Sequence, residues 1–173
     1  ANNPTVEDIE KELRAQIERA ISTGLDIKYV DYHMSTAVDK PEHRKIVEQL
    51  AQEYKLGISR YFGEVDLESM YKYPVVEKQS HLLELIFDLN SDQINLLVCH
   101  IGKDLPEMQA LIDLNTFGLK QMSQHRQAEL EALTDPSFTK LLVRKRVKLI
   151  TYDTIINRIG LSEMISPVSA GYK

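Results

Sequence analysis

The sequence predicts an α/β fold in a single domain of residues 1–173, and three observations favour it. Segments with apolar residues three and four positions apart, typical of amphipathic helices, recur along the chain. Short apolar runs, typical of strands, separate these segments. The two patterns alternate, as they do in proteins whose parallel strands are connected by helices.

The first helix is expected over residues 6–21, where Thr5 and Asp8 resemble a capping box and Gly24 is suited to end the helix. Further helices are expected from Pro41 to near Gly57, over residues 76–89, over residues 121–133, from Pro136 onward, and over residues 154–159. Strands are expected over residues 27–30, 58–62, 94–99 and 147–150, with a long loop over residues 63–74. Residues 94–99 form the strongest of these strands, a nearly continuous apolar run of the buried parallel type.

The composition excludes several classes of protein. The 173 residues are 43% hydrophobic and 27% charged, and their net charge of −5 disfavours binding to nucleic acid. No apolar run approaches the roughly 20 residues that a membrane helix needs. Cys99 is the single cysteine, which excludes an internal disulfide and a multi-cysteine zinc site. A single thiol fits a reducing compartment, and we expect a cytoplasmic protein.

Asp31 and His33 follow the first predicted strand. They are two positions apart, so in an extended backbone their side chains point to the same side. A carboxylate beside an imidazole is the usual pairing of a metal ligand with its orienting partner, or of an acid with a base. A histidine that caps a loop, with Asp31 accepting hydrogen bonds from main-chain amides, is the alternative.

His100 follows the strand predicted over residues 94–99. Gly102 permits a tight turn there, and Asp104 and Glu107 are close enough in sequence to hold the imidazole. A histidine that is merely satisfied at a strand end is the alternative. Because the carboxyl ends of parallel strands converge on one face, two such histidines together suggest one metal-binding and one proton-transferring imidazole.

The other candidates are expected to be structural. His43, His81 and His125 are expected at solvated positions. The basic run over residues 144–148 could bind phosphate, but it is expected to mark the end of a helix, where cations interact favourably with the helix dipole. The sequence has no P-loop, no dinucleotide-binding fingerprint and no nucleophile elbow.

Three segments resemble a known family in the right order and spacing. The helix over residues 8–20 leads to a strand end that reads Asp31-Tyr32-His33-Met34-Ser35-Thr36. The second segment runs from His100 to Met108, and the third from Arg126 to Pro136 and on to a closing strand near residue 150. In these segments the chain is similar to the YdjC-like carbohydrate deacetylases, the ChbG/HpnK family, over most of residues 5–157.

The resemblance implies a divalent-metal hydrolase, using Mg²⁺ or Zn²⁺, that removes acetyl groups from N-acetylated carbohydrates of the chitooligosaccharide type. It also implies an irregular (β/α) barrel of the TIM type. His33 would be a metal ligand, His100 would be the catalytic acid that protonates the leaving amine, and Asp31 would support the site. These roles suit the residue types, since an imidazole is well placed to transfer a proton near neutral pH.

The chain also departs from the family pattern. Tyr32 replaces a small serine, Ser35 replaces a glycine, and Ile101 replaces the proline after the second histidine. The family's Asp-Asp motif and its further histidine ligand have no counterpart in this sequence. We therefore expect the chain to be the carboxyl-terminal part of a longer deacetylase, with only the later part of the barrel. An open barrel edge would favour self-association, so we expect a homo-oligomer.

Two other functions stay open. One is a non-catalytic carbohydrate-binding or scaffold module that has kept the fold and lost the metal site. The other is a different barrel hydrolase, such as a phosphoesterase, with a histidine at a strand end. Activity on acetylated sugars rather than on phosphate esters would separate the hydrolases.

Overall fold

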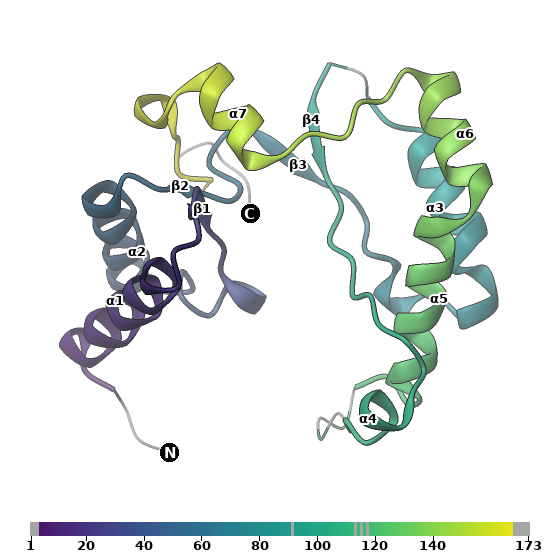
Figure 1. Cartoon of the computed structure of the whole chain (residues 1–173), viewed down its shortest axis with the longest axis horizontal. Helices are drawn as coiled ribbons and strands as arrows, with labels where there is room; N and C mark the ends of the chain where they lie inside the picture. Colours follow the sequence, from purple (N-terminus) through teal and green to yellow (C-terminus); the bar gives the residue numbers. More distant parts are fainter. Residues whose placement is uncertain (1–3, 91, 113, 115, 117, 168–173) are drawn as a thin grey trace. The chain divides into compact units, whose positions relative to one another are not determined.

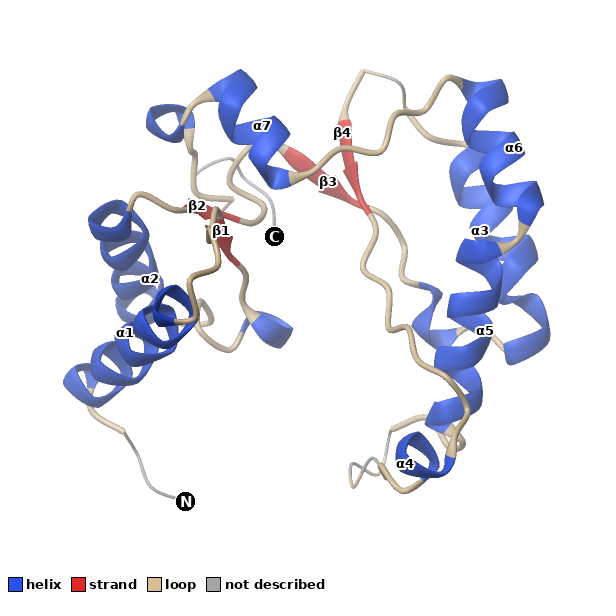
Figure 2. Cartoon of the chain, viewed as in Figure 1, coloured by secondary structure: helices blue, strands red, loops and turns tan. Residues whose placement is uncertain are grey.

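The computed structural model describes residues 4–90, 92–112, 114, 116 and 118–167. Helices and strands alternate along much of the chain, which confirms the α/β class (Figure 1). In chain order the elements are α1 (Val6–Ser22), β1 (Tyr29–Val30), η1 (His33–Ser35), α2 (Pro41–Tyr54), β2 (Gly57–Ile58), β3 (Glu64–Asp66), η2 (Met70–Lys72), η3 (Val75–Glu77), α3 (Lys78–Phe87), β4 (Ile94–Leu96), α4 (Pro106–Gln109), α5 (Met122–Thr134), α6 (Pro136–Lys145), α7 (Tyr152–Ile159) and η4 (Leu161–Glu163). Figure 2 shows that helix predominates and that the strands are short. None of the helices in the described ranges is both long and apolar enough to span a membrane.

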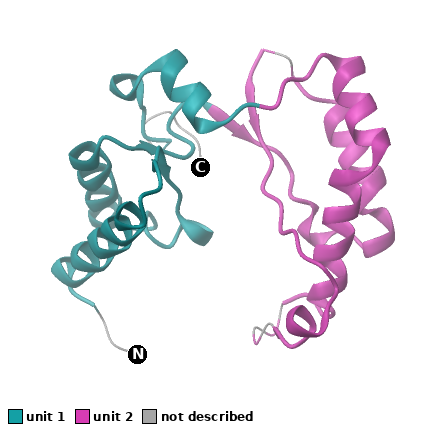
Figure 3. Cartoon of the chain, viewed as in Figure 1, with its two compact units in different colours: residues 1–63, 150–173 teal, residues 64–149 magenta. Residues whose placement is uncertain are grey.

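The chain forms two compact units, each with its own two-stranded parallel sheet (Figure 3). Unit 1 comprises residues 1–63 and 150–173, and unit 2 comprises residues 64–149. β1 pairs with β2 in unit 1, and β3 pairs with β4 in unit 2. One domain over residues 1–173 stays a prediction.

The first helix of unit 1 begins where the sequence predicts. The Thr5 hydroxyl accepts a hydrogen bond from the Asp8 N–H at 3.1 Å, and the Asp8 carboxylate accepts one from the Thr5 N–H at 2.9 Å. This reciprocal pair satisfies donors that a helix start leaves free. Half-buried Leu13 and Ile17 of α1 pack against the core of unit 1. That core is formed by Val38, Val47, Ala51, Leu56, Ile58 and Tyr61.

The helix α7 returns to unit 1 from the far end of the chain and packs on the β1–β2 pair. The rings of Tyr152 and Tyr29 stack with their centroids 4.1 Å apart. Tyr29 lies opposite Gly57 in the sheet, and a Cβ at Gly57 would be 2.9 Å from the Ile156 Cδ1 atom. Glycine at this position therefore lets α7 approach the strand closely.

In unit 2 the helices α3, α5 and α6 pack against one another (Figure 1). Asp135 caps α6 by accepting a hydrogen bond from the Ser137 N–H at 2.7 Å, and Pro136 occupies the first helical position, as predicted. Arg144 and Lys145 lie in the last turn of α6, which confirms the predicted end of that helix. The core of the unit is formed by Met70, Leu82, Ile86, Ala132, Phe138, Leu141 and Leu142.

Three strands are shorter than the sequence predicts. β1 covers Tyr29–Val30 of the expected residues 27–30. β2 ends at Ile58, whereas residues 58–62 were expected, because the chain turns at Arg60, which has a φ of 68°. β4 covers Ile94–Leu96 of the six expected residues, and it is half-buried rather than fully buried. The apolar run that favoured a longer strand includes Leu97 and Cys99, which instead pack from an irregular segment against the core of unit 2.

Two further predictions are wrong. Residues 64–66, expected in a loop, form β3, which pairs along its full length with β4. Residues 147–150, expected as a strand, have no regular structure, and Leu149 is 72% exposed. The difference lies in the partners, because a strand exists only where a neighbour accepts and donates its main-chain hydrogen bonds.

Candidate functional site

The residues that follow β1 and β2 meet at the carboxyl end of the sheet in unit 1. Val30 lies opposite Ile58, which places Asp31 beside Ser59 and Arg60. The Ser59 hydroxyl donates a hydrogen bond to the Asp31 carboxylate, and the Arg60 Nη1 atom lies 3.4 Å from the same oxygen. The side chain of Asp31 is 59% exposed. Asp31 is therefore an accessible carboxylate whose position is set by the end of β2.

His33 opens the short helix η1, and its side chain is exposed. The next two residues, Met34 and Ser35, have positive φ angles of 50° and 61°, which are uncommon for residues other than glycine. They turn the chain immediately after the histidine. Among the described residues no hydrogen bond joins the ring of His33 to Asp31, so their pairing stays a prediction.

The predicted metal ion needs several ligands that lie close together. In the described ranges, no group of three or more His, Cys, Asp or Glu side chains is arranged to hold one. Catalytic zinc sites usually have three protein ligands, and Mg²⁺ takes an octahedral set of oxygen ligands. His33 offers a single nitrogen, so the described residues do not form a metal centre by themselves.

The main chain of His100 is bound by a carboxylate in unit 2. His100 lies four positions after the end of β4, and its N–H donates a hydrogen bond to the Glu129 Oε2 atom at 2.6 Å. The Nδ1 atom of the ring is buried, has no hydrogen-bond partner among the described residues, and lies 3.9 Å from the same oxygen. The side chain as a whole is 32% exposed, so side-chain atoms other than Nδ1 carry that exposure. The edge of the ring also contacts Tyr71, with the centroids 5.6 Å apart.

The carboxylate that binds His100 belongs to a buried ion pair. Lys78 and Glu129 are 0% and 1% exposed, and the Lys78 Nζ atom lies 3.1 Å from the Glu129 Oε1 atom. Lys78 also donates to the carbonyl oxygens of Met70 at 2.6 Å and Tyr71 at 3.3 Å. All three ammonium hydrogens therefore have acceptors, as a buried charge requires.

The acids that the sequence predicts beside His100 are Asp104 and Glu107. Asp104 instead accepts a hydrogen bond from Gln109 at 3.0 Å, and Glu107 is exposed. Lys78 and Glu129 are 51 positions apart, so their pairing could not be recognised from spacing. The available signal was weak: a glutamate at position 129 on the apolar side of a helix, with Ala128 and Ala132 also buried.

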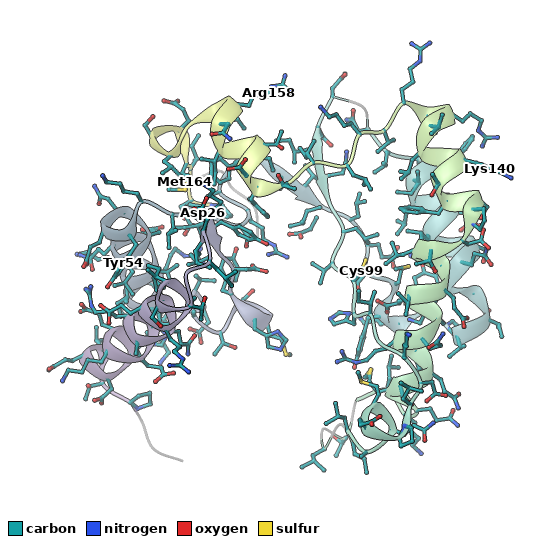
Figure 4. All side chains as sticks on the ribbon, in the orientation of Figure 1. Asp26, Tyr54, Cys99, Lys140, Arg158 and Met164 are labelled. Atoms are coloured by element: carbon teal, nitrogen blue, oxygen red, sulfur yellow. The ribbon has the colours of Figure 1, made fainter. Side chains whose placement is uncertain are left out.

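The buried pair also affects two neighbouring groups. Burial lowers the pKa of His125, and the positive charge of Lys78 lowers it further. Burial raises the pKa of the Cys99 thiol to about 11, and the Glu129 carboxylate contributes in the same direction. Figure 4 labels Cys99 on the segment that follows β4. His125 is half-buried and its Nδ1 atom is buried, so it is not the solvated histidine that the sequence predicts.

The remaining two histidines differ from the prediction as well. His81 is 6% exposed, and its ring stacks on Tyr73 with the centroids 3.4 Å apart. His43 is half-buried and lies 2.9 Å from the Asp39 carboxylate. Each contact lies within one unit and accounts for the burial of its histidine without a functional role.

The predicted site residues fall into two groups. Asp31 and His33 lie in unit 1, and His100 lies in unit 2. Within its unit each follows a parallel strand, as expected. The prediction that both histidines line one face stays a prediction.

Comparisons with known proteins agree with the resemblance in the sequence. A family model described as YdjC-like protein matches residues 1–144. A carbohydrate deacetylase from Geobacillus stearothermophilus is 30% identical over 156 residues, which cover 84% of this chain and 58% of that protein. A carbohydrate deacetylase from Brevibacillus brevis is 26% identical over 157 residues, which cover 86% of this chain and 62% of that protein.

These matches span more than four-fifths of the chain but less than two-thirds of each relative. They include the segments that carry Asp31, His33 and His100. The resemblance predicted from the sequence is confirmed: the chain belongs to the YdjC-like protein family.

Proposed function

We propose that this chain forms part of a carbohydrate deacetylase, a hydrolase that cleaves the amide bond of N-acetylated sugars. The observation that carries the proposal is the similarity to two carbohydrate deacetylases across most of the chain. We further propose a substrate of the chitooligosaccharide type and an irregular barrel-like α/β architecture for the complete catalytic domain.

His100 is the proposed catalytic acid. Hydrolysis of an amide breaks the C–N bond after water has added to the carbonyl carbon, and the departing nitrogen must gain a proton. An imidazole titrates in the range in which it can give that proton at neutral pH. The buried Nδ1 atom of His100 is next to Glu129, and the exposed part of the ring is left to approach a substrate.

Asp31 and His33 are proposed to serve the metal side of the site. His33 would be one ligand of a divalent ion, Mg²⁺ or Zn²⁺, whose other ligands would come from outside the described residues. Asp31 would act beside it as an oriented carboxylate, since Ser59 and Arg60 already hold it.

A non-catalytic carbohydrate-binding or scaffold module is the second candidate. The observation in its favour is that no complete set of metal ligands is found among the described residues. Such a module would bind acetylated oligosaccharides and release no acetate.

Acetate release from short N-acetylglucosamine oligomers tests the proposal. The gene product at its natural length should be assayed with and without a chelator, beside the variants His100→Ala and His43→Ala. His43→Ala is the matched control, because His43 lies on α2 in unit 1 and contacts Asp39. We expect release that is abolished by the chelator and by His100→Ala but kept in His43→Ala. A folded protein that binds the oligomers but releases no acetate with metal supplied would favour the module instead.

A further inference from the structure

We propose that Glu129, held in place by Lys78, is a positioning residue for His100. This inference rests on the proposed function, since it assigns His100 the role of the acid. It concerns Glu129, a carboxylate in unit 2 that lies within the third resembling segment but to which the resemblance assigns no role.

The first step in the argument is the geometry of the carboxylate. One oxygen of Glu129 accepts a hydrogen bond from the Lys78 ammonium at 3.1 Å, and the other accepts one from the His100 N–H at 2.6 Å. Each oxygen thus binds a different partner, and a rotation of the carboxylate would break one of the two hydrogen bonds. A hydrogen bond to an ionised acceptor is stronger than one between neutral groups. The main chain at His100 is therefore fixed relative to α5.

The second step is the position of the lysine. Lys78 is fully buried at the start of α3 and also binds the carbonyl oxygens of Met70 and Tyr71 in η2. The ring of Tyr71 in turn contacts the ring of His100. One ammonium group thus binds the carboxylate beside the imidazole and the main chain of the tyrosine whose ring contacts it.

The third step is the orientation of the ring. The Nδ1 atom is buried 3.9 Å from Glu129 Oε2, and among the described residues it has no hydrogen-bond partner. When the ring is protonated on both nitrogens, a small rotation brings the Nδ1–H to this carboxylate. The proton on the other nitrogen then remains available for the leaving amine.

The first test measures the contact and does not depend on activity. In NMR spectra of the chain, the His100 amide proton should lie downfield and exchange slowly with solvent, because it donates to a carboxylate. Glu129→Gln should move it upfield and speed its exchange, whereas Glu131→Gln should not. Glu131 is the matched control, since it lies two positions away on α5 and is exposed. Exchange and chemical shift at His100 that are unchanged in Glu129→Gln would overturn the proposal.

The second test separates positioning from folding by changing the leaving group. N-acetylated sugars need a proton on the departing nitrogen, whereas para-nitrophenyl acetate releases a phenolate that needs none. We expect Glu129→Gln to lower amide cleavage by about tenfold or more and to leave ester cleavage within about twofold. Glu129→Asp, which keeps the carboxylate, should recover part of the amide activity.

The second test distinguishes a failure of the positioning role from a failure of the proposed function. If the native protein is active and Glu129→Gln lowers both reactions equally, or neither, then the positioning role is overturned alone. If the native protein cleaves neither substrate, the proposed function fails and the positioning role fails with it. Because Glu129→Gln leaves Lys78 buried without its partner, the double variant Lys78→Gln/Glu129→Gln provides a second background. It removes both charges, and the same selective loss of amide cleavage is expected there.

Discussion

The main-chain N–H of His100 donates a 2.6 Å hydrogen bond to the carboxylate of Glu129, which lies 29 positions later on α5. The carboxylate is 1% exposed and its other oxygen faces Lys78. The segment that carries the candidate acid is therefore held by a helix of unit 2, and its position depends on a buried ion pair.

Removal of one partner of that pair should destabilise the protein strongly. Lys78→Gln leaves the Glu129 carboxylate buried without a counter-charge, and we expect a loss of about 3–5 kcal/mol in the free energy of unfolding. Lys78→Gln/Glu129→Gln should cost much less than the sum of the single changes, because no uncompensated charge is left. Urea titration measures each value, and Glu131→Gln should stay within about 0.5 kcal/mol of the native protein. Strict additivity of the two single losses would contradict the expectation.

Cys99 should react slowly with thiol reagents. Burial and the Glu129 carboxylate raise the pKa of Cys99 to about 11, so little thiolate is present at neutral pH. We expect alkylation by iodoacetamide at pH 8 to be on the order of 100-fold slower than for a free cysteine, and to accelerate as the pH rises toward 11. Unfolding in urea should restore the ordinary rate. A native rate equal to that of a free thiol would show that the thiol is not buried as described.

Gly57→Ala should destabilise unit 1, because the added Cβ would be 2.9 Å from the Ile156 Cδ1 atom of α7. Overpacking of this kind costs about 1–3 kcal/mol. Ile156→Val removes the atom that would clash, so Gly57→Ala/Ile156→Val should cost less than the two single changes together. The unfolding free energies of all four proteins complete the cycle. A loss of unfolding free energy in the double variant that equals the sum of the two single losses would show that the strain does not come from the Ile156 Cδ1 atom.

The cap of α1 predicts a pH dependence. Hydrogen bonds from the Thr5 hydroxyl and the Thr5 N–H lower the pKa of Asp8. A carboxylate with a lowered folded pKa stabilises the fold above its unfolded value, about pH 4, and this contribution is lost as the pH falls through the folded pKa. Asp8→Asn should therefore lower the urea midpoint at pH 7 and have a smaller effect near pH 2. An effect of equal size at both values would exclude the carboxylate as its cause.

The 173-residue chain alone should bind metal weakly, since no group of three ligands gathers among the described residues. A ligand that binds no more tightly than its own concentration adds at most about 0.4 kcal/mol of stability. We therefore expect millimolar Mg²⁺ or a chelator to shift Tm by less than about 2 °C. His33→Ala should behave in the same way. A rise of several degrees with Mg²⁺ that His33→Ala abolishes would instead reveal a preformed site.

The parts of the fold that could be predicted are those in which neighbouring residues decide the structure. The start of α1 depends on Thr5 and Asp8, and the start of α6 depends on Asp135 and Pro136, so each is visible in a few letters. β3 was missed because Glu64 and Asp66 are acidic in a three-residue strand, which becomes a strand only beside β4.

In the candidate site, the residues at the strand ends could be predicted, but the residues that support them could not. Asp31, His33 and His100 could be named because they follow apolar runs that form parallel strands. Their supporting groups could not, because Lys and Glu are most often on the surface and their burial depends on distant partners. Lys78 and Glu129 become a pair only when α3 packs on α5.

Unit 1 is made from two stretches of chain that are separated by the whole of unit 2. A ribosome that synthesises this polypeptide completes residues 64–149 while α7 is still unmade. The Tyr29 ring and the surface beside Gly57 therefore stay uncovered until Tyr152 and Ile156 have been synthesised. Vectorial synthesis thus favours unit 2 as the first to reach its native packing. Chains that stall before Tyr152 should be captured by chaperones or degraded through their incomplete first unit.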